Sequence, residues 1–241
     1  MSSVHEKTCL VVPCYNESQR LDLQRFYDFL DCFYFVFVND GSKDNTLQFL
    51  EANKKEGVYI LNLKRNVGKA EAVRRGMLFM QDLPLYHSVK WVGYMDADLA
   101  TPLSEIRNFL LYNDVFDYNA DAIWGSRVKR LGSRIFRSPS RDLFGRAFAT
   151  FVGFLLDTGF YDSQCGAKLF RKELIGELFG ERFTSRWIFD IEILLRLGKH
   201  RVVEYPLKEW RDVRGGKVKI LRLLPQILRD IIMIKRRYRQ R

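Results

Sequence analysis

The chain has 241 residues, of which 47% are apolar and 14% aromatic, so it can bury a well-packed core and is not a disordered or low-complexity protein. Its longest apolar stretch, Phe148 to Leu156, is far shorter than the ~20 residues that span a bilayer, and the first residues lack the apolar core of a signal peptide. The net charge of +11 predicts partners such as phosphates, anionic lipid or nucleic acid.

Most of this positive charge lies in two segments. Residues 127–146 contain seven basic residues and one acidic residue, and residues 217–241 contain nine basic residues and one acidic residue. The four cysteines show no spacing typical of metal ligands, which favours a reducing, cytoplasmic environment, and Cys165 is expected to be a small buried residue in a tight turn.

Apolar runs rich in β-branched and aromatic residues alternate with segments of helical periodicity. The expected strands are Thr8–Val12, Tyr34–Val38, Val58–Leu63, Lys90–Met95 and Ala120–Gly125. The expected helices between them are Leu21–Leu30, Thr46–Asn53, Lys69–Met80 and Leu103–Tyr112. This order predicts an α/β fold with a mostly parallel central sheet flanked by helices. No linker divides the chain, so we expect one domain over residues 1–216, followed by a basic amphipathic helix and tail over residues 217–241.

Polar, sharply turning sequence follows each of the first four expected strands: PCYNES, NDGSKDNT, RNVGKAEAV and DADLATP. Each stretch taken alone is compatible with an ordinary turn or helix cap. In a parallel sheet, however, the carboxyl ends of the strands meet at one edge, where ligands bind. Because all four polar stretches are expected at this one edge, in the order of the strands, they favour a binding site.

Asp96 and Asp98 directly follow a strand of buried type. Alternate residues of an extended strand end point the same way, so both carboxylates can face one point, where they repel each other unless a cation lies between them. Oxygen ligands of this kind suit Mg²⁺ or Mn²⁺, which can hold a diphosphate and stabilise its charge as it leaves.

As an ordered set over roughly residues 8–105, these motifs resemble the donor-binding half of the inverting family 2 glycosyltransferases, which have the GT-A fold. The resemblance implies that Pro13, Tyr15 and Glu17 line the nucleoside and that Asp40 hydrogen-bonds the base. It also implies that Lys69 lies near the base or diphosphate and that Asp96 and Asp98 bind the metal ion on the diphosphate, with Asp98 counted among the catalytic residues.

The second half, about residues 120–216, carries GSR, DSQCGAKLFR, RWIFDIEIL and EYPLKEWRDVRGGKVK. These stretches resemble the branch that transfers sugars to polyprenyl phosphates, the dolichyl-phosphate glucosyltransferases above all and the dolichyl-phosphate mannose synthases next. The resemblance implies transfer of glucose from UDP-glucose to a polyprenyl phosphate at the cytoplasmic face of a membrane. The chain departs from the mannose synthases at Ala100, because those relatives have there a glutamine that helps to hold the metal. Close relatives also carry a transmembrane anchor, and none is expected here.

Arginine suits phosphate oxygens, and the arginines after residue 126 alternate with apolar residues. We therefore expect Arg127, Arg137 and Arg141 to bind an acceptor phosphate, with Arg127 as the catalytic member; a solvated basic loop is the alternative. Asp190 and Glu192 lie on a helical segment and point roughly 200° apart, so one is expected to be a surface charge. The resemblance implies that Asp190 is the inward residue. It would act as a general base if the acceptor is a saccharide hydroxyl, or orient the acceptor or a basic neighbour if it is a phosphate. The alternative is a buried carboxylate paired with an arginine.

Near the C-terminus, apolar residues recur every three or four positions at Leu224, Ile227, Leu228, Ile231 and Ile234, within basic sequence, and Pro225 is expected to start or kink this helix. Such a helix can lie in the headgroup layer of an anionic membrane or pack on the core. We expect peripheral membrane binding, with a separate membrane partner as an alternative. A nucleic-acid-binding module leaves the strand-end motifs unexplained, so no nucleic-acid partner is expected.

Overall fold

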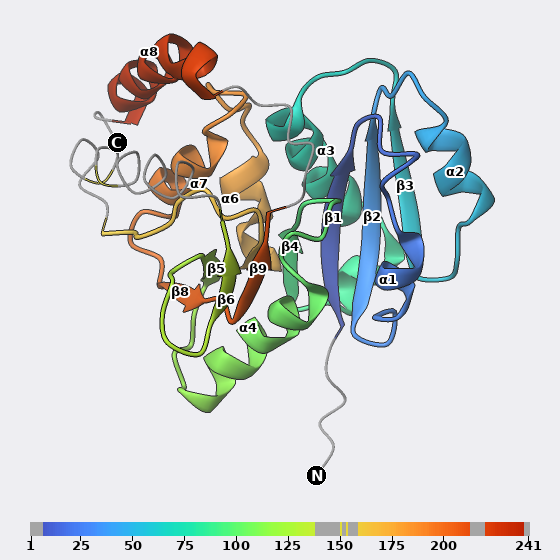
Figure 1. Cartoon of the computed structure of the whole chain (residues 1–241), viewed down its shortest axis with the longest axis horizontal. Helices are drawn as coiled ribbons and strands as arrows, with labels where there is room; N and C mark the ends of the chain where they lie inside the picture. Colours follow the sequence, from blue (N-terminus) through green and yellow to red (C-terminus); the bar gives the residue numbers. More distant parts are fainter. Residues whose placement is uncertain (1–6, 138–149, 151–152, 154–158, 213–219, 239–241) are drawn as a thin grey trace.

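The computed structural model describes residues 7–137, 150, 153, 159–212 and 220–238 (Figure 1). The strands are β1 (Thr8–Cys14), β2 (Phe33–Asp40), β3 (Val58–Leu63), β4 (Trp91–Tyr94), β5 (Ala122–Ser126), β6 (Arg134–Phe136), β7 (Lys168–Arg171), β8 (Val202–Pro206) and β9 (Glu209–Arg211). The α-helices are α1 (Leu23–Tyr27), α2 (Thr46–Ala52), α3 (Lys69–Gln81), α4 (Leu103–Val115), α6 (Ile175–Phe179), α7 (Phe189–Leu197) and α8 (Ile220–Tyr238). Two short 3₁₀ turns are η1 (Pro84–His87) and η2 (Lys172–Leu174).

Seven strands form one sheet in the order β3-β2-β1-β4-β7-β5-β8. All neighbours pair in parallel except β7, which is antiparallel to both β4 and β5. The expectation of a mostly parallel sheet is therefore confirmed. Because β2 lies on one side of β1 and β4 on the other, the strand order reverses between β1 and β4, and ligands of open α/β sheets bind outside the carboxyl ends of the strands at such a point.

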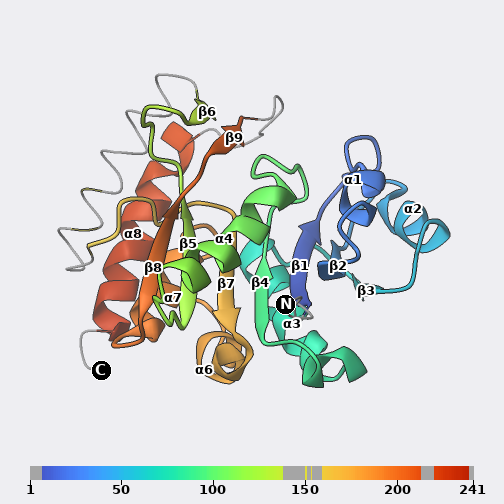
Figure 2. The same ribbon diagram turned by 90° about the horizontal axis from the view of Figure 1, so that it is seen from below.

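Helices cover both faces of the sheet (Figures 1 and 2). One core cluster joins the sheet to α1, α2 and α4, through side chains such as Phe26, Leu50 and Phe109. The other joins the opposite face to α3, α6 and α7, through Met77 and Phe179 among others. Because β1, β2, β4 and β5 are buried on both faces, their sequences read as nearly continuous apolar runs, which is why the sequence located them.

Each of the five expected strands is present, and three of the four expected helices begin at the expected residue. The first is shorter: α1 covers Leu23–Tyr27 only, because Asp22 caps its start by accepting a hydrogen bond from the Arg25 amide. Strands β6 to β9 were not predicted. They have three to five residues each, too few to establish a periodicity.

Helix α8 packs on α7 rather than presenting one free apolar face. Ile231 and Ile234 are buried against the α7 region, and Ile227 packs beside them, whereas Leu228 is 42% exposed. The expectation of a single membrane-facing stripe is therefore wrong for these three isoleucines, since α7 already covers them; the side chain of Leu224 lies outside the described residues. Pro225 lies inside α8 and does not start it.

Within the described residues, no helix combines the length and apolar character that crossing a bilayer requires. The expected boundary between residues 216 and 217 lies outside the described residues.

Candidate active site

Hydrogen bonds tie the loop after β1 to the loop after β2. The Asn16 amide donates to Ser42 Oγ over 3.0 Å, and the Glu17 amide donates to Thr46 Oγ1 over 2.8 Å. Asn16 adopts a left-handed conformation with a φ of 54°, which asparagine tolerates better than most residues. Tyr15 and Glu17, two of the predicted nucleoside-lining residues, therefore lie on a fixed loop, where Tyr15 is 39% exposed. The third, Pro13, is partly buried near the end of β1.

Asp44 anchors the same pair of loops. Its carboxylate accepts hydrogen bonds from the amide and hydroxyl of both Ser18 and Thr46. Desolvation disfavours the charged form, but these hydrogen bonds outweigh it and lower the pKa of Asp44 to about 2. This stabilising contribution is present above the usual pKa range of an aspartate and is lost as the pH falls through about 2.

Asp40, the predicted base-binding residue, holds the loop that precedes α3. Its two carboxylate oxygens accept hydrogen bonds from the Val67 amide at 2.7 Å, the Gly68 amide at 2.9 Å and Asn66 Nδ2 at 3.0 Å. Burial raises the pKa of Asp40, although these bonds and nearby positive charges oppose the rise. Asp40 thus has a structural role in the loop, and its contact with a base stays a prediction.

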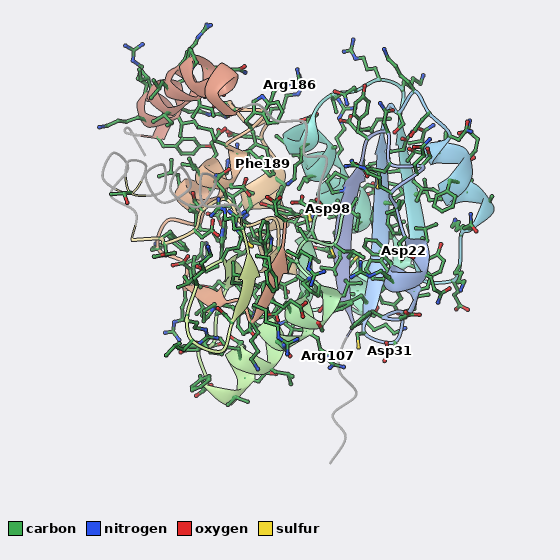
Figure 3. All side chains as sticks on the ribbon, in the orientation of Figure 1. Asp22, Asp31, Asp98, Arg107, Arg186 and Phe189 are labelled. Carbon is green, nitrogen blue, oxygen red and sulfur yellow. The ribbon has the colours of Figure 1, made fainter. Side chains whose placement is uncertain are left out.

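Asp96 and Asp98 lie on a tight turn directly after β4, at the edge of the sheet near the point where the strand order reverses. Asp98 is labelled in Figure 3. Leu99 has a φ of 52°, an unfavourable conformation for leucine that costs of order 1 kcal/mol, and backbone strain of this kind clusters at active sites and ligand-binding turns. Asp98 Oδ1 accepts a hydrogen bond from the Ala100 amide at 3.0 Å. Burial, followed by the negative charge of Asp96, raises the pKa of Asp98.

Lys69, the first residue of α3, forms an ion pair with Asp96. Desolvation disfavours the lysine charge, but the carboxylates of Asp96, Asp190 and Asp98 outweigh it and raise the Lys69 pKa. The other carboxylate oxygen of Asp96 lies close to Gly166, where a Cβ atom would be only 2.1 Å from Asp96 Oδ2. A glycine at this position therefore leaves room for the Asp96 carboxylate.

These two carboxylates fit a magnesium or manganese ion. Mg²⁺ is usually held by one or two protein carboxylates together with substrate phosphates and water, rather than by a cage of protein ligands. Consistent with this, the described residues contain no cluster of three or more His, Cys, Asp or Glu side chains arranged around a metal position. Lys69 now neutralises Asp96, as a cation bound there would, and the phosphates of a donor can supply the ligand that Ala100 does not.

Asp190 lies on α7 in a buried network beneath this turn. Its Oδ1 atom accepts hydrogen bonds from Tyr94 at 2.5 Å and from Lys168 Nζ at 2.6 Å. The Lys168 side chain is fully buried, and its ammonium also lies 4.3 Å from the centre of the Trp124 ring. Burial and the negative charge of Asp190 raise the pKa of Tyr94 well above its ordinary value. Asp190 is therefore a buried, paired carboxylate, which was one of the expected alternatives, but its partner is a lysine rather than an arginine.

The expectation that either Asp190 or Glu192 is a surface charge is wrong. Asp190 is 6% exposed and Glu192 is fully buried. The two side chains do point to different surroundings, but both surroundings are inside the protein. Glu192 accepts hydrogen bonds from the amides of Thr184 and Ser185. Backbone donors of this kind make burial of a carboxylate possible.

Arg127 follows β5 and forms a two-pronged ion pair with Asp162. Its Nε atom lies 2.6 Å from Asp162 Oδ2 and its Nη2 atom 2.8 Å from Oδ1, while its guanidinium lies 5.4 Å from the centre of the Trp210 ring. Burial disfavours the charged forms of both, but each stabilises the other, so the pKa of Arg127 is raised and that of Asp162 lowered. Arg137 is partly buried, and Arg141 lies outside the described residues.

The turn that contains DSQCG supplies residues whose roles the sequence did not indicate. Asp162 holds Arg127, Gly166 contacts Asp96, and Lys168 begins β7 and binds Asp190. Cys165 is fully buried there, as expected, and burial raises the pKa of its thiol. A lysine between apolar residues in a strand could have signalled a buried ion pair, because an unpaired charge at such a position is costly.

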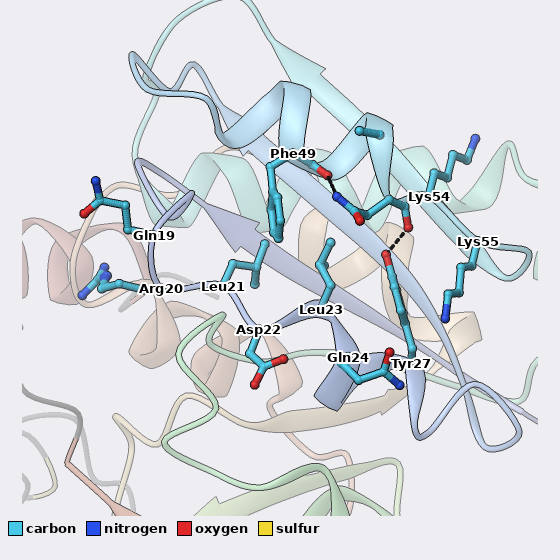
Figure 4. A pocket seen from close by; sticks show the side chains of 12 residues that line it. Gln19, Arg20, Leu21, Asp22, Leu23, Gln24, Tyr27, Phe49, Lys54 and Lys55 are labelled. Atoms are coloured by element: carbon cyan, nitrogen blue, oxygen red, sulfur yellow. Dashed lines mark hydrogen bonds between the residues drawn. The ribbon is translucent and has the colours of Figure 1, made fainter.

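An open groove lies between α1 and α2, lined by residues such as Leu23, Tyr27, Phe49 and Lys55 (Figure 4). None of its lining residues is among the predicted site residues, and its walls lack paired carboxylates or an arginine cluster. The chemistry described above lies outside this groove, at the carboxyl ends of β1, β2 and β4.

Comparison with solved structures shows the fold. The chain matches glucosyl-3-phosphoglycerate synthase from Mycobacterium tuberculosis in complex with UDP, with a TM-score of 0.66 and 17% identity over 95% of this chain and 80% of that chain. The same enzyme with Mn²⁺, UDP and glucosyl-3-phosphoglycerate matches with a TM-score of 0.65 and 18% identity, over 97% of this chain and 80% of that chain.

Sequence comparison shows the family. A family model described as glycosyl transferase family 2 matches residues 9–179. The dolichyl-phosphate beta-glucosyltransferase of Dictyostelium discoideum is 30% identical and that of Drosophila melanogaster 32%, each over 95% of this chain and 74% of the relative. The Saccharomyces cerevisiae protein of the same name is 30% identical over the same shares. The chain therefore belongs to glycosyl transferase family 2 and is a hexosyltransferase with the GT-A fold.

Proposed function

We propose that this enzyme transfers glucose from UDP-glucose to a polyprenyl or dolichyl phosphate, with inversion at the anomeric carbon and with Mg²⁺ or Mn²⁺. The observation that carries the proposal is the Asp96–Asp98 turn, paired with Lys69 at the point where the strand order of the sheet reverses. The substrates are proposed from the relatives' name, dolichyl-phosphate beta-glucosyltransferase, and from the UDP in the structural neighbours.

Asp96 and Asp98 would hold the metal ion, which neutralises charge on the diphosphate as it leaves. Lys69, which pairs with Asp96, would add a second positive charge near the same diphosphate. The loops after β1 and β2 would hold the nucleoside. Inversion needs the acceptor oxygen to attack in line from the opposite face of the sugar, so positioning and electrostatics supply most of the rate.

The alternative is the same donor chemistry on a saccharide hydroxyl, with Asp190 as the general base. A hydroxyl acceptor must lose its proton, whereas a phosphate is already ionised near neutral pH. The observed contacts favour phosphate: Asp190 Oδ1 already accepts two short hydrogen bonds, from Tyr94 and from Lys168, and the side chain is buried, so little of it is open to an acceptor hydroxyl.

A screen of nucleotide sugars tests the proposal. Purified protein with Mg²⁺ or Mn²⁺ is expected to convert UDP-glucose faster than UDP-galactose, UDP-N-acetylglucosamine or GDP-mannose when a short polyprenyl phosphate is present. The product is a β-linked glycosyl lipid, identified by mass spectrometry and NMR. Transfer to free saccharides but not to the lipid phosphate would support the alternative.

We also propose peripheral binding to the cytoplasmic face of a membrane through the outer side of α8. Leu228, Ile232 and Met233 are each more than 40% exposed, and Arg229 and Lys235 lie exposed on the same helix. An apolar strip within basic residues suits an anionic headgroup layer, where each basic residue contributes about 1 kcal/mol.

Serine at Leu228 and Ile232 is expected to weaken binding to anionic liposomes several-fold, and salt is expected to weaken it further. Flotation of liposomes measures the bound fraction. Val115→Ser on α4, at a position 75% exposed, is the control and should bind as well as the unchanged protein. These surface variants are preferable to removing α8, because α7 packs against its inner side. Equal binding by all variants would favour delivery of the lipid by a separate membrane partner.

A further inference from the structure

The loop between α6 and α7 places an arginine over the start of α3. Arg186, labelled in Figure 3, is exposed on this loop. Its guanidinium nevertheless closely approaches Gly68, the residue before Lys69. A Cβ atom at Gly68 would lie 2.8 Å from Arg186 Nε and 2.9 Å from Nη2. Gly68 also has a φ of 91°, which side chains rarely tolerate, so glycine is required both by the backbone and by the close approach of the arginine.

The surroundings of Arg186 belong to the donor side of the site. Gly68 donates its amide hydrogen to Asp40, and the next residue, Lys69, forms the ion pair with Asp96. Within the described part of the chain, Arg186 itself takes part in no ion pair within 4.0 Å, although its charge acts on the Asp40 carboxylate. The guanidinium thus lies beside Gly68, one residue from the lysine that pairs with Asp96.

The backbone that carries Arg186 is fixed from two helices. Ser185 is buried, and its hydroxyl donates to Asp230 Oδ2 of α8 at 2.6 Å while accepting the amide hydrogens of Trp187 and Ile188 at 3.1 Å. The Ser185 amide donates to the buried Glu192 of α7 at 2.9 Å. The residues on both sides of Arg186 are thus held, although its side chain is exposed.

Helix α8 contributes further contacts to the same loop. Arg237 donates to the Arg182 carbonyl and to Thr184 Oγ1, each at 3.1 Å, and forms an ion pair with Glu181 at 2.7 Å. Together with the isoleucines on its inner side, these contacts make α8 a support for the loop. The position of Arg186 therefore depends on residues more than 40 positions later in the chain.

We propose that Arg186 binds the diphosphate of the nucleotide sugar and that Asp230 is a positioning residue, which acts through Ser185 to hold Arg186 over Gly68. The planar guanidinium can donate two parallel hydrogen bonds to phosphate oxygens, which a lysine cannot reproduce. This inference rests on the proposed function, because it takes the donor to be a nucleoside diphosphate sugar. It gives α8 a role in donor binding that is separate from contact with a membrane.

Binding of UDP and of uridine, measured with Mg²⁺ by calorimetry and by NMR titration, tests the inference. Arg186→Ala is expected to weaken UDP binding about tenfold or more, because charge-assisted hydrogen bonds are lost, and to leave uridine binding unchanged. Arg186→Lys should recover part of the loss. Arg182→Ala removes an exposed arginine from the same loop and should bind both ligands as the unchanged protein does.

Asp230→Ala is expected to raise the KM for the donor several-fold with little change in kcat, and Asp230→Asn, which keeps an acceptor for the Ser185 hydroxyl, should restore it. Equal UDP binding by the unchanged protein and Arg186→Ala, or a parallel loss of UDP and uridine binding, would overturn the inference alone. Failure of the unchanged protein to bind UDP would overturn the proposed donor and the inference with it.

Discussion

Replacing Asp98 with asparagine is expected to lower turnover by about a hundredfold or more while leaving the fold intact. The substitution removes one of two charged metal ligands, and metal stabilisation of a leaving group is worth several kcal/mol of the barrier, with each 1.4 kcal/mol equal to a factor of ten. The fold should persist because asparagine Oδ1 can still accept the hydrogen bond from the Ala100 amide. Transfer rates and thermal unfolding, measured on the same preparation, separate the two effects.

Two controls accompany this experiment. Asp117→Asn changes an exposed carboxylate at a left-handed position that asparagine also tolerates, so its activity should equal that of the unchanged protein. Excess chelator should abolish the activity of the unchanged protein, and added Mn²⁺ or Mg²⁺ should restore it. Full activity in chelator would mean that Asp96 and Asp98 do not bind a metal, and that Lys69 alone neutralises them.

The sequence predicted the first half of the fold well because each element there is local. A continuous apolar run identifies a strand buried on both faces, and polar turn residues mark its end, so β1 to β5 and the sheet edge that carries Asp96 could be located from short windows. The antiparallel β7 could not be located in this way, because its two apolar residues are flanked by a lysine and an arginine and form no continuous apolar run.

Contacts between distant residues explain most of what the sequence did not reveal. Lys168 meets Asp190 across 22 positions, Arg127 meets Asp162 across 35, and Ser185 meets Asp230 across 45. The wrong expectation for the exposure of Asp190 and Glu192 has the same origin. Helical periodicity gives the direction of the Glu192 side chain, but it does not show that backbone amides of another segment donate hydrogen bonds to its carboxylate. Similarly, one apolar stripe on α8 proved to be divided between α7 and solvent.

The acceptor class is expected to show in the contrast between Arg127→Ala and Asp190→Asn. If the nucleophile is a phosphate, Arg127→Ala should lower transfer to a polyprenyl phosphate roughly a hundredfold, because a charge-assisted contact to the acceptor is lost, while donor binding changes little. Asp190→Asn should retain appreciable transfer, because asparagine Oδ1 can still accept from Tyr94 and Lys168, and an ionised phosphate needs no base.

Arg127→Ala also breaks the ion pair between Arg127 and Asp162, so this variant needs a control that separates stability from transfer. Arg127→Ala leaves the Asp162 carboxylate buried without its partner, which can cost about 3–5 kcal/mol of stability, so transfer must be measured well below the unfolding temperature. Asp162→Asn weakens the ion pair but leaves the guanidinium in place; it should therefore lower stability yet keep transfer, which a purely structural role for Arg127 would not allow. If instead Arg127→Ala keeps transfer and Asp190→Asn is inactive, the acceptor is a hydroxyl, and the lysine beside Asp190 serves to hold a base in position.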